Sequence, residues 1–177
     1  MEASLVGSEM CIRDRLRPHQ KKAIQAMSKH NKGQVIVPTG GGKTICMIQD
    51  AIEQFKSDRL KTIVVVAPRI LLANQLCEEF LEFIDDVDVL HVHSGETHHD
   101  STTNSKKIEE WHWKSKRHQL IFTTYHSLHK IQKATAMLPD TVYFDEAHNA
   151  VQKNFVEAVE HHSMYVVRNY FFTATPK

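Results

Sequence analysis

The part of this chain that most constrains its fold is a glycine-rich stretch, Val37-Pro38-Thr39-Gly40-Gly41-Gly42-Lys43-Thr44. A short apolar run precedes it and an amphipathic run, 45–55, follows it, so the predicted order is strand, glycine turn, helix. Three consecutive glycines let backbone N–H groups converge on an anion without interference from Cβ atoms. The first turn of the next helix adds unpaired N–H donors and a partial positive charge. The stretch therefore predicts a turn that binds phosphate.

Two side chains extend this turn into a nucleotide site. Lys43 can reach terminal phosphates, and the Thr44 hydroxyl can hold a magnesium ion. Val37 occupies the position of the first glycine in the usual Walker A pattern, which is one departure from it. We predict nucleotide contacts from Thr39, Gly40, Gly41, Gly42, Lys43 and Thr44. The alternative is a glycine-rich turn in some other α/β protein.

Strand-like and helix-like segments alternate along the chain. The predicted strands are 34–37, 62–67, 87–92, 120–124, 141–144 and a last one within 164–172. The first predicted helix begins at Pro18 and ends at Lys32-Gly33. The other predicted helices are 43–55, 70–84, 108–113, 127–133 and 155–159. Such alternation predicts an α/β fold with right-handed crossovers and an open, mostly parallel sheet. Ligands bind at the carboxyl ends of such strands, so the glycine turn, Pro68, Thr124, Asp145 and Thr173 should share one edge.

A second chemical motif, Asp145-Glu146-Ala147-His148, follows the apolar residues 142–144. Adjacent carboxylates repel each other unless a cation or a function offsets the repulsion. Beside a phosphate-binding turn, Asp145 is the expected partner of a magnesium ion held by Thr44. Glu146 can then orient, or take a proton from, the water that attacks the γ-phosphate. Taken alone, these residues could instead be a helix start with acidic side chains at the positive end of the dipole.

The order of these motifs resembles a known family. PTGGGKT, DEAH and TAT (Thr173-Ala174-Thr175) resemble motifs I, II and III of superfamily 2 helicases, in particular the group that includes helicase subunits of type III restriction enzymes. LRPHQ, 16–20, resembles the opening motif of that group, whose glutamine, here Gln20, reads adenine. The resemblance implies a RecA-like P-loop domain, a three-layer sandwich that binds ATP and Mg²⁺.

Two further motifs are similar to those that line the nucleic-acid track in this family. APRILLANQ, 67–75, is similar to motif Ia, and TTYHSL, 123–128, to the next strand-contacting motif. The resemblance implies that Arg69 and Thr124 contact nucleic acid, DNA in preference to RNA. It also implies that His148, Thr173 and Thr175 couple nucleotide state to that contact. Alternatively, Arg69 is a solvated helix-start residue and Thr124 caps a strand end.

The resemblance covers residues 16–177 and implies one motor domain. Residues 1–15 resemble a translated linker found in environmental sequence, or form a disordered arm. Enzymes of the family have a second RecA-like domain with an arginine finger, which in related phosphate chemistry contributes about 10³–10⁵ in rate. We therefore expect the first motor domain of a longer protein, nearly inactive alone. Alternatives are a nucleotide-dependent sensing module that separates no strands, an RNA helicase and a phosphate-loop kinase.

Composition narrows the remaining possibilities. The net charge of +1 over 177 residues gives no global field toward nucleic acid or membrane, so any nucleic-acid contact must be local. Three cysteines without a CxxC pair indicate no disulfide framework or zinc motif and favour an intracellular, cytoplasm-like compartment. No apolar run approaches the roughly 20 residues of a membrane span. Among thirteen histidines, we expect His91, His93, His98 and His99 to lie in a loop without a metal, and His161-His162 to be a solvated helix end.

Overall fold

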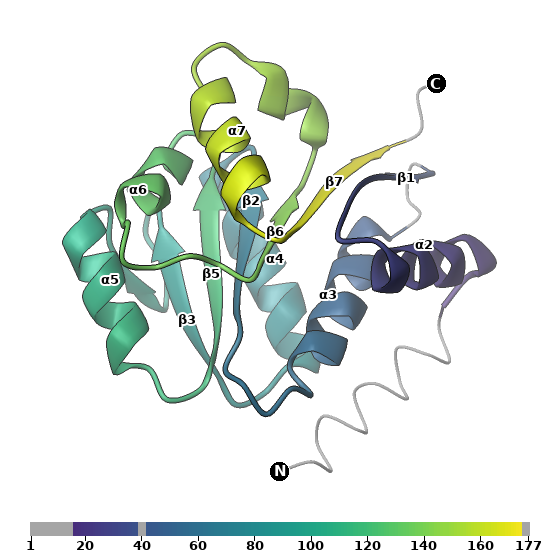
Figure 1. Cartoon of the computed structure of the whole chain (residues 1–177), viewed down its shortest axis with the longest axis horizontal. Coiled ribbons are helices and arrows are strands. Elements are labelled where there is room, and N and C mark those ends of the chain that lie inside the picture. The colour runs from purple at the N-terminus through teal and green to yellow at the C-terminus, as the bar shows by residue number, and fades with distance from the viewer. Residues whose placement is uncertain (1–15, 39–41, 175–177) are drawn as a thin grey trace.

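The computed structural model describes residues 16–38 and 42–174, which form a seven-stranded parallel sheet between two layers of helices (Figure 1). The strands lie in the order β1-β7-β6-β2-β5-β3-β4. Their bounds are β1 Lys32–Val37, β2 Thr62–Ala67, β3 Val87–Val92, β4 Asp100–Ser101, β5 His118–Thr124, β6 Thr141–Phe144 and β7 Arg168–Ala174. All six pairings between them are parallel.

The helices are α2 Pro18–Lys29, α3 Lys43–Gln54, α4 Ile70–Phe83, α5 Ser105–Lys114, α6 Leu128–Lys133, the 3-10 helix η1 Ala147–Val151 and α7 Val156–Tyr165. Side chains of α2, α3 and α4 share one core with one face of the sheet, and those of α5, α6 and α7 share a second core with the other face. Strand β2 explains why two cores form: Ile63 and Val65 enter the first, and Val64 and Val66 the second. A strand buried on both faces reads as a continuous apolar run. The predicted three-layer α/β sandwich is confirmed.

Most predicted strands occur at the predicted residues, and the differences follow from pairing and helix length. Strand β1 begins at Lys32, so the expectation that Lys32-Gly33 ends a helix is wrong. Both residues pair with β7, whose ladder runs the full length of β1 and overrides the local preference of glycine for a helix end. Strand β4 lies where no strand was predicted, and α7 continues to Tyr165, beyond its predicted end.

Three histidines of the predicted loop and of the predicted helix end are buried. His162 is 1% exposed, and its Nδ1–H donates to the carbonyl of Ala158 at 2.8 Å, because the longer α7 turns this residue inward. Burial lowers the pKa of His162 to about 4, although the Ala158 carbonyl opposes that shift. His91 and His93 are also buried, at the end of β3 and just beyond it. The expectation of a solvated helix end is therefore wrong for His162, and His91 belongs to β3 rather than to a loop.

A buried polar network fixes α3 against the two strands that end at the predicted catalytic edge. Arg168 of β7 makes two hydrogen bonds to the carboxylate of Asp50 in α3, at 2.9 and 2.8 Å. The Tyr143 hydroxyl of β6 donates to the same carboxylate, and Gln54 adds a bond of 2.8 Å. Burial opposes the charge of Arg168, but Asp50 raises its pKa. The network positions α3, and thus Lys43 at its start, relative to β6.

The helices of the described ranges are short. The longest helix in the described ranges, α4, has 14 residues, and none is both long and apolar enough to span a bilayer.

Candidate functional site

The sheet brings the predicted motifs to its carboxyl edge. In the register, Ala67 pairs with Thr124, Val66 with Phe144, and Val37 with Ala174. The segments that follow β1, β2, β5 and β6 therefore emerge side by side. Thr39, Gly40, Gly41 and Thr175 lie outside the described residues, so their roles stay predictions.

Lys43 lies between the two carboxylates of the DEAH segment. It is the first residue of α3, and its Nζ is 3.2 Å from Oδ1 of Asp145 and forms a hydrogen-bonded ion pair with Glu146. The exposed fractions of the three side chains are 18% for Lys43, 11% for Asp145 and 33% for Glu146. The cation that two adjacent carboxylates require is thus supplied by the residue predicted to bind phosphate.

The pKa shifts at this site follow from burial and charge together. Burial opposes the charge on Lys43, but Glu146 and Asp145 outweigh it and raise the pKa of the ammonium group. Burial also raises the pKa of Asp145, a shift that Lys43 opposes and Glu146 increases. Asp145 is therefore a partly desolvated carboxylate whose charged form depends on a nearby cation.

Glu146 has a backbone conformation that non-glycine residues seldom adopt. Its φ of 49° and ψ of 60° are left-handed, and Asp86 is the one other non-glycine residue with positive φ in the described ranges. Such a conformation costs on the order of 1–3 kcal/mol and persists where neighbouring contacts impose it. Here the backbone and side-chain amides of Asn149 both donate to the Glu146 carbonyl at 3.0 Å.

Tyr125 also fixes this turn, and sequence reasoning missed it. Its buried hydroxyl donates to the carbonyl of Asp145 at 2.7 Å, and the Asp145 N–H donates to Val66 at 2.8 Å. Burial raises the pKa of Tyr125, so the hydroxyl stays protonated as a donor. Tyr125 lies within TTYHSL, but only the pairing of β5, β2 and β6 reveals the contact.

Gln20 packs against the described end of the glycine turn. Its Nε2 donates to the Gly42 carbonyl at 3.4 Å, and its Oε1 accepts from the Arg17 N–H at 2.9 Å. Gly42 has a φ of 76°, and a Cβ there would lie 2.4 Å from Nε2 of Gln20. The positive φ therefore favours glycine at position 42, and a Cβ there would also displace the flexible end of Gln20. The adenine contact of Gln20 stays a prediction.

Thr44 has a partner that the sequence did not indicate. Glu79 of α4 lies close to its side chain. Burial raises the pKa of Glu79, the Thr44 side chain opposes this shift, and the charge of Asp145 adds to it. Thr44, Asp145 and Glu79 thus form a set of oxygen donors, the kind that Mg²⁺ prefers. The donor set fits the predicted ion.

The two residues predicted to contact nucleic acid differ in exposure. Arg69 caps the start of α4 and is exposed. Thr124 is 4% exposed, and its hydroxyl accepts from the Ser127 N–H at 3.3 Å, as a strand-end cap does. Their strands are neighbours, but the nucleic-acid contacts themselves stay predictions.

The residues predicted to couple the two sites line one cavity. His148 and Thr173 border a space of about 510 Å³ between β7, η1 and α7. Nδ1 of His148 lies 3.7 Å from Oε2 of Glu146. The Thr173 hydroxyl donates to the Ala174 carbonyl at 3.5 Å. The coupling roles of His148 and Thr173 stay predictions.

The sheet order, the two helix layers and the strand–turn–helix unit that carries Lys43 define a RecA-like P-loop domain. The family model described as "Type III restriction enzyme, res subunit" matches residues 13–177. The chain belongs to this family. No curated protein matches it.

Solved structures show the same fold. A nuclease-deletion mutant of the Type ISP restriction-modification enzyme LlaGI, in complex with a DNA substrate mimic, is 23% identical with a TM-score of 0.77, covering 92% of this chain and 18% of that one. The Hef helicase domain of Pyrococcus furiosus is 18% identical with a TM-score of 0.66, and the match covers 91% of this chain and 32% of the Hef chain. The UvsW helicase of bacteriophage T4 is 15% identical with a TM-score of 0.66, and the match covers 89% of this chain and 52% of the UvsW chain. The chain thus spans less than a fifth of the LlaGI chain.

Proposed function

We propose that this chain is the ATP-binding motor domain of a superfamily 2 DNA helicase or translocase, which couples ATP hydrolysis to movement on nucleic acid. The observation that carries the proposal is the position of Lys43 between Asp145 and Glu146, at the carboxyl edge and beside Gly42. Membership in the restriction-enzyme family supports it.

ATP would bind along the glycine turn, with Gln20 at the adenine and residues 39–44 at the phosphates. Lys43 would exchange its carboxylate partners for phosphate oxygens, which form comparably strong charge-assisted hydrogen bonds. Thr44 and Asp145 would hold Mg²⁺, and Glu79 lies close enough to Thr44 to join them. The ion supplies charge neutralisation at the phosphates.

Hydrolysis would depend on the carboxylate that Lys43 releases. Once free of that ion pair, Glu146 can orient a water molecule and accept its proton. The left-handed backbone at Glu146 and the Tyr125 bond to Asp145 hold the turn in place, so the carboxylate needs only a side-chain movement.

Nucleic acid would lie across the same edge. Arg69 and Thr124 would contact phosphates, which positions a strand without reading its sequence. The similar LlaGI structure is described as a complex with a DNA substrate mimic, which favours DNA over RNA. His148 and Thr173, which share a cavity, would relay nucleotide state together with Thr175. We propose that a second RecA-like domain completes the cleft, and that these 177 residues alone hydrolyse ATP slowly.

The function is tested by ATP turnover in the protein with both RecA-like domains present, with single-stranded DNA, duplex DNA or RNA added. DNA is expected to stimulate turnover more than RNA, and Lys43→Ala to abolish the stimulation. Strand displacement on a forked duplex then separates a helicase from a translocase or sensing module. Turnover unaffected by any nucleic acid would contradict a motor function.

A further inference from the structure

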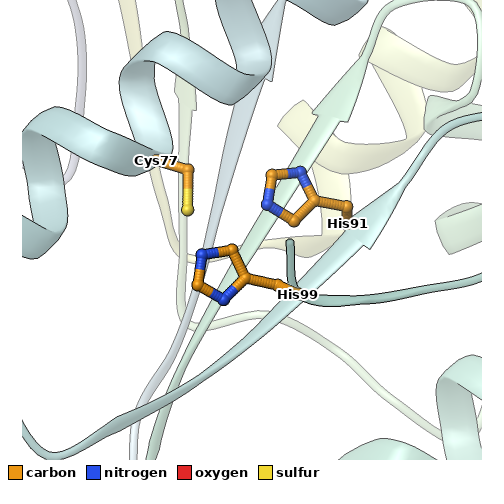
Figure 2. Close-up of side chains that lie close together, drawn as sticks. All are labelled: Cys77, His91 and His99. Carbon is orange, nitrogen blue, oxygen red and sulfur yellow. The ribbon is translucent and has the colours of Figure 1, made fainter. Parts of the chain in front are cut away.

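A second group of reactive side chains lies beyond the ATP site. Cys77 of α4, His91 of β3 and His99 of the segment before β4 come together beside the sheet (Figure 2). The Cys77 sulfur and one ring nitrogen of each histidine lie within 4.8 Å of one another. Figure 2 shows these atoms turned toward one shared space.

His91 presents an unpartnered polar atom to this space. Its ring is fully buried, and Nδ1 is hydrogen-bonded to Nε2 of His93 at 3.0 Å. Nε2, on the side that faces Cys77 and His99, has no hydrogen-bond partner among the described residues. An unsatisfied buried polar atom costs about 1–3 kcal/mol, so a native site that retains one calls for an explanation.

One thiol sulfur and two imidazole nitrogens are a set of ligands that zinc prefers. We propose that Cys77, His91 and His99 form a zinc site with one coordination position left for water. The open position would face a cavity of about 820 Å³ that all three residues line, together with Glu78 and Glu96. Three protein ligands and a solvent position is the arrangement of open zinc sites, in contrast to four-ligand structural sites.

The three ligand atoms need to move only modestly closer together to bind zinc. Zinc bonds of 2.0–2.3 Å in a tetrahedron place ligand atoms roughly 3.3–3.6 Å apart. The present limit of 4.8 Å can close by movement of His99, which is exposed and belongs to a connecting segment. Cys77 and His91 belong to α4 and β3 and would stay in place.

Zinc would change the hydrogen bonds behind His91. The Gly95 N–H donates to Nδ1 of His93 at 3.2 Å, so the proton of uncharged His93 is on Nε2 and points to Nδ1 of His91. The proton of His91 is then on Nε2, where zinc would bind. On binding, this proton moves to Nδ1 of His91, and that of His93 moves to its Nδ1, while the Cys77 thiol loses one proton to solvent. His93 can then no longer accept from Gly95.

Zinc binding would therefore change the contact between α4 and the segment after β3 that contains Gly95 and Glu96. Gly95 packs against Ile70, since a Cβ at Gly95 would lie 2.4 Å from that side chain. The Glu96 carbonyl accepts from Nδ2 of Asn74 at 3.1 Å. Both partners are in the first turns of α4, the helix that starts after Arg69. The metal would join the segment after β3 to the helix proposed to contact nucleic acid.

The test is zinc titration of the metal-stripped chain against a competing chelator, repeated with Co²⁺ to detect a thiolate-to-cobalt charge-transfer band. One metal ion per chain is expected. Cys77→Ser should remove the band, and the exposed His99→Ala should weaken affinity by at least about 100-fold, the upper range for losing an outer-shell partner. His98→Ala, which changes an exposed histidine of the same cavity, and Cys11→Ser should change neither.

Several results would overturn the site: no retained zinc, a cobalt band that survives in Cys77→Ser, or equal weakening by His98→Ala and His99→Ala. The last would show adventitious binding by surface histidines. Amide hydrogen exchange at Gly95 tests the proton shift separately. Exchange should become faster with zinc bound, and unchanged exchange would refute the coupling to the Gly95 turn.

Discussion

Replacing Glu146 by glutamine is expected to lower ATP turnover about 10²–10⁴-fold, the usual contribution of a positioned general base. The same change should leave ATP affinity equal or slightly higher. In the present structure Glu146 forms an ion pair with Lys43, so it competes with phosphate for the ammonium group. Glutamine weakens that competition and keeps Asp145 as the second partner. The measurements are turnover and ATP binding in the protein with both RecA-like domains.

Glu157→Gln is the matched control, because Glu157 is an exposed glutamate in the first turn of α7. It should change neither quantity. If Glu146→Gln lost ATP binding as strongly as turnover, the division of roles between Lys43 and Glu146 would be wrong.

Replacing Asp50 by alanine should lower the free energy of unfolding by about 3–5 kcal/mol, because it removes the carboxylate partner of a mostly buried arginine. Asp50 is 6% exposed and accepts two hydrogen bonds from Arg168, whose side chain is 18% exposed. Tyr143 and Gln54 would lose their acceptor as well. Denaturant-induced unfolding measures the change.

Asp58→Ala removes an exposed aspartate in the turn after α3 and should stay within about 0.5 kcal/mol of the unsubstituted chain. A loss below about 1 kcal/mol for Asp50→Ala would show that the network does not hold α3 against β6 and β7. Lys43 would then owe its position to the glycine turn alone.

The fold was predictable because its signals are local. The strands 62–67, 87–92 and 141–144 begin and end as predicted, and 62–67 and 141–144 are buried in the sheet along their whole length. The first strand was predicted too short because Gly33 suggests a helix end, whereas pairing with β7 is a long-range effect. The extra turns of α7 were missed because His161, His162 and Ser163 are polar in sequence, although His162 points into the core.

The two motifs of the site could be predicted from the sequence, but the contacts that join them could not. Spacing indicated Lys43 and Asp145-Glu146, and their ion pairing follows from the order of strands in the sheet. Tyr125 and Glu79 could not be found in this way, because they act through a backbone carbonyl and a hydroxyl on other elements. Cys77 was equally out of reach, since it lies 14 positions before His91 and matches no metal-binding spacing.

The central claim is that Lys43 binds the phosphates of ATP at the place where it now contacts Asp145 and Glu146. It is tested most directly by titrating these 177 residues with Mg·ATP and comparing Lys43→Ala with Lys29→Ala, an exposed lysine of α2. Loss of charge-assisted bonds worth about 1.5–3 kcal/mol predicts about 10- to 100-fold weaker binding for Lys43→Ala. Lys29→Ala should bind as the unsubstituted chain does. Equal ATP affinity in all three proteins would contradict the claim.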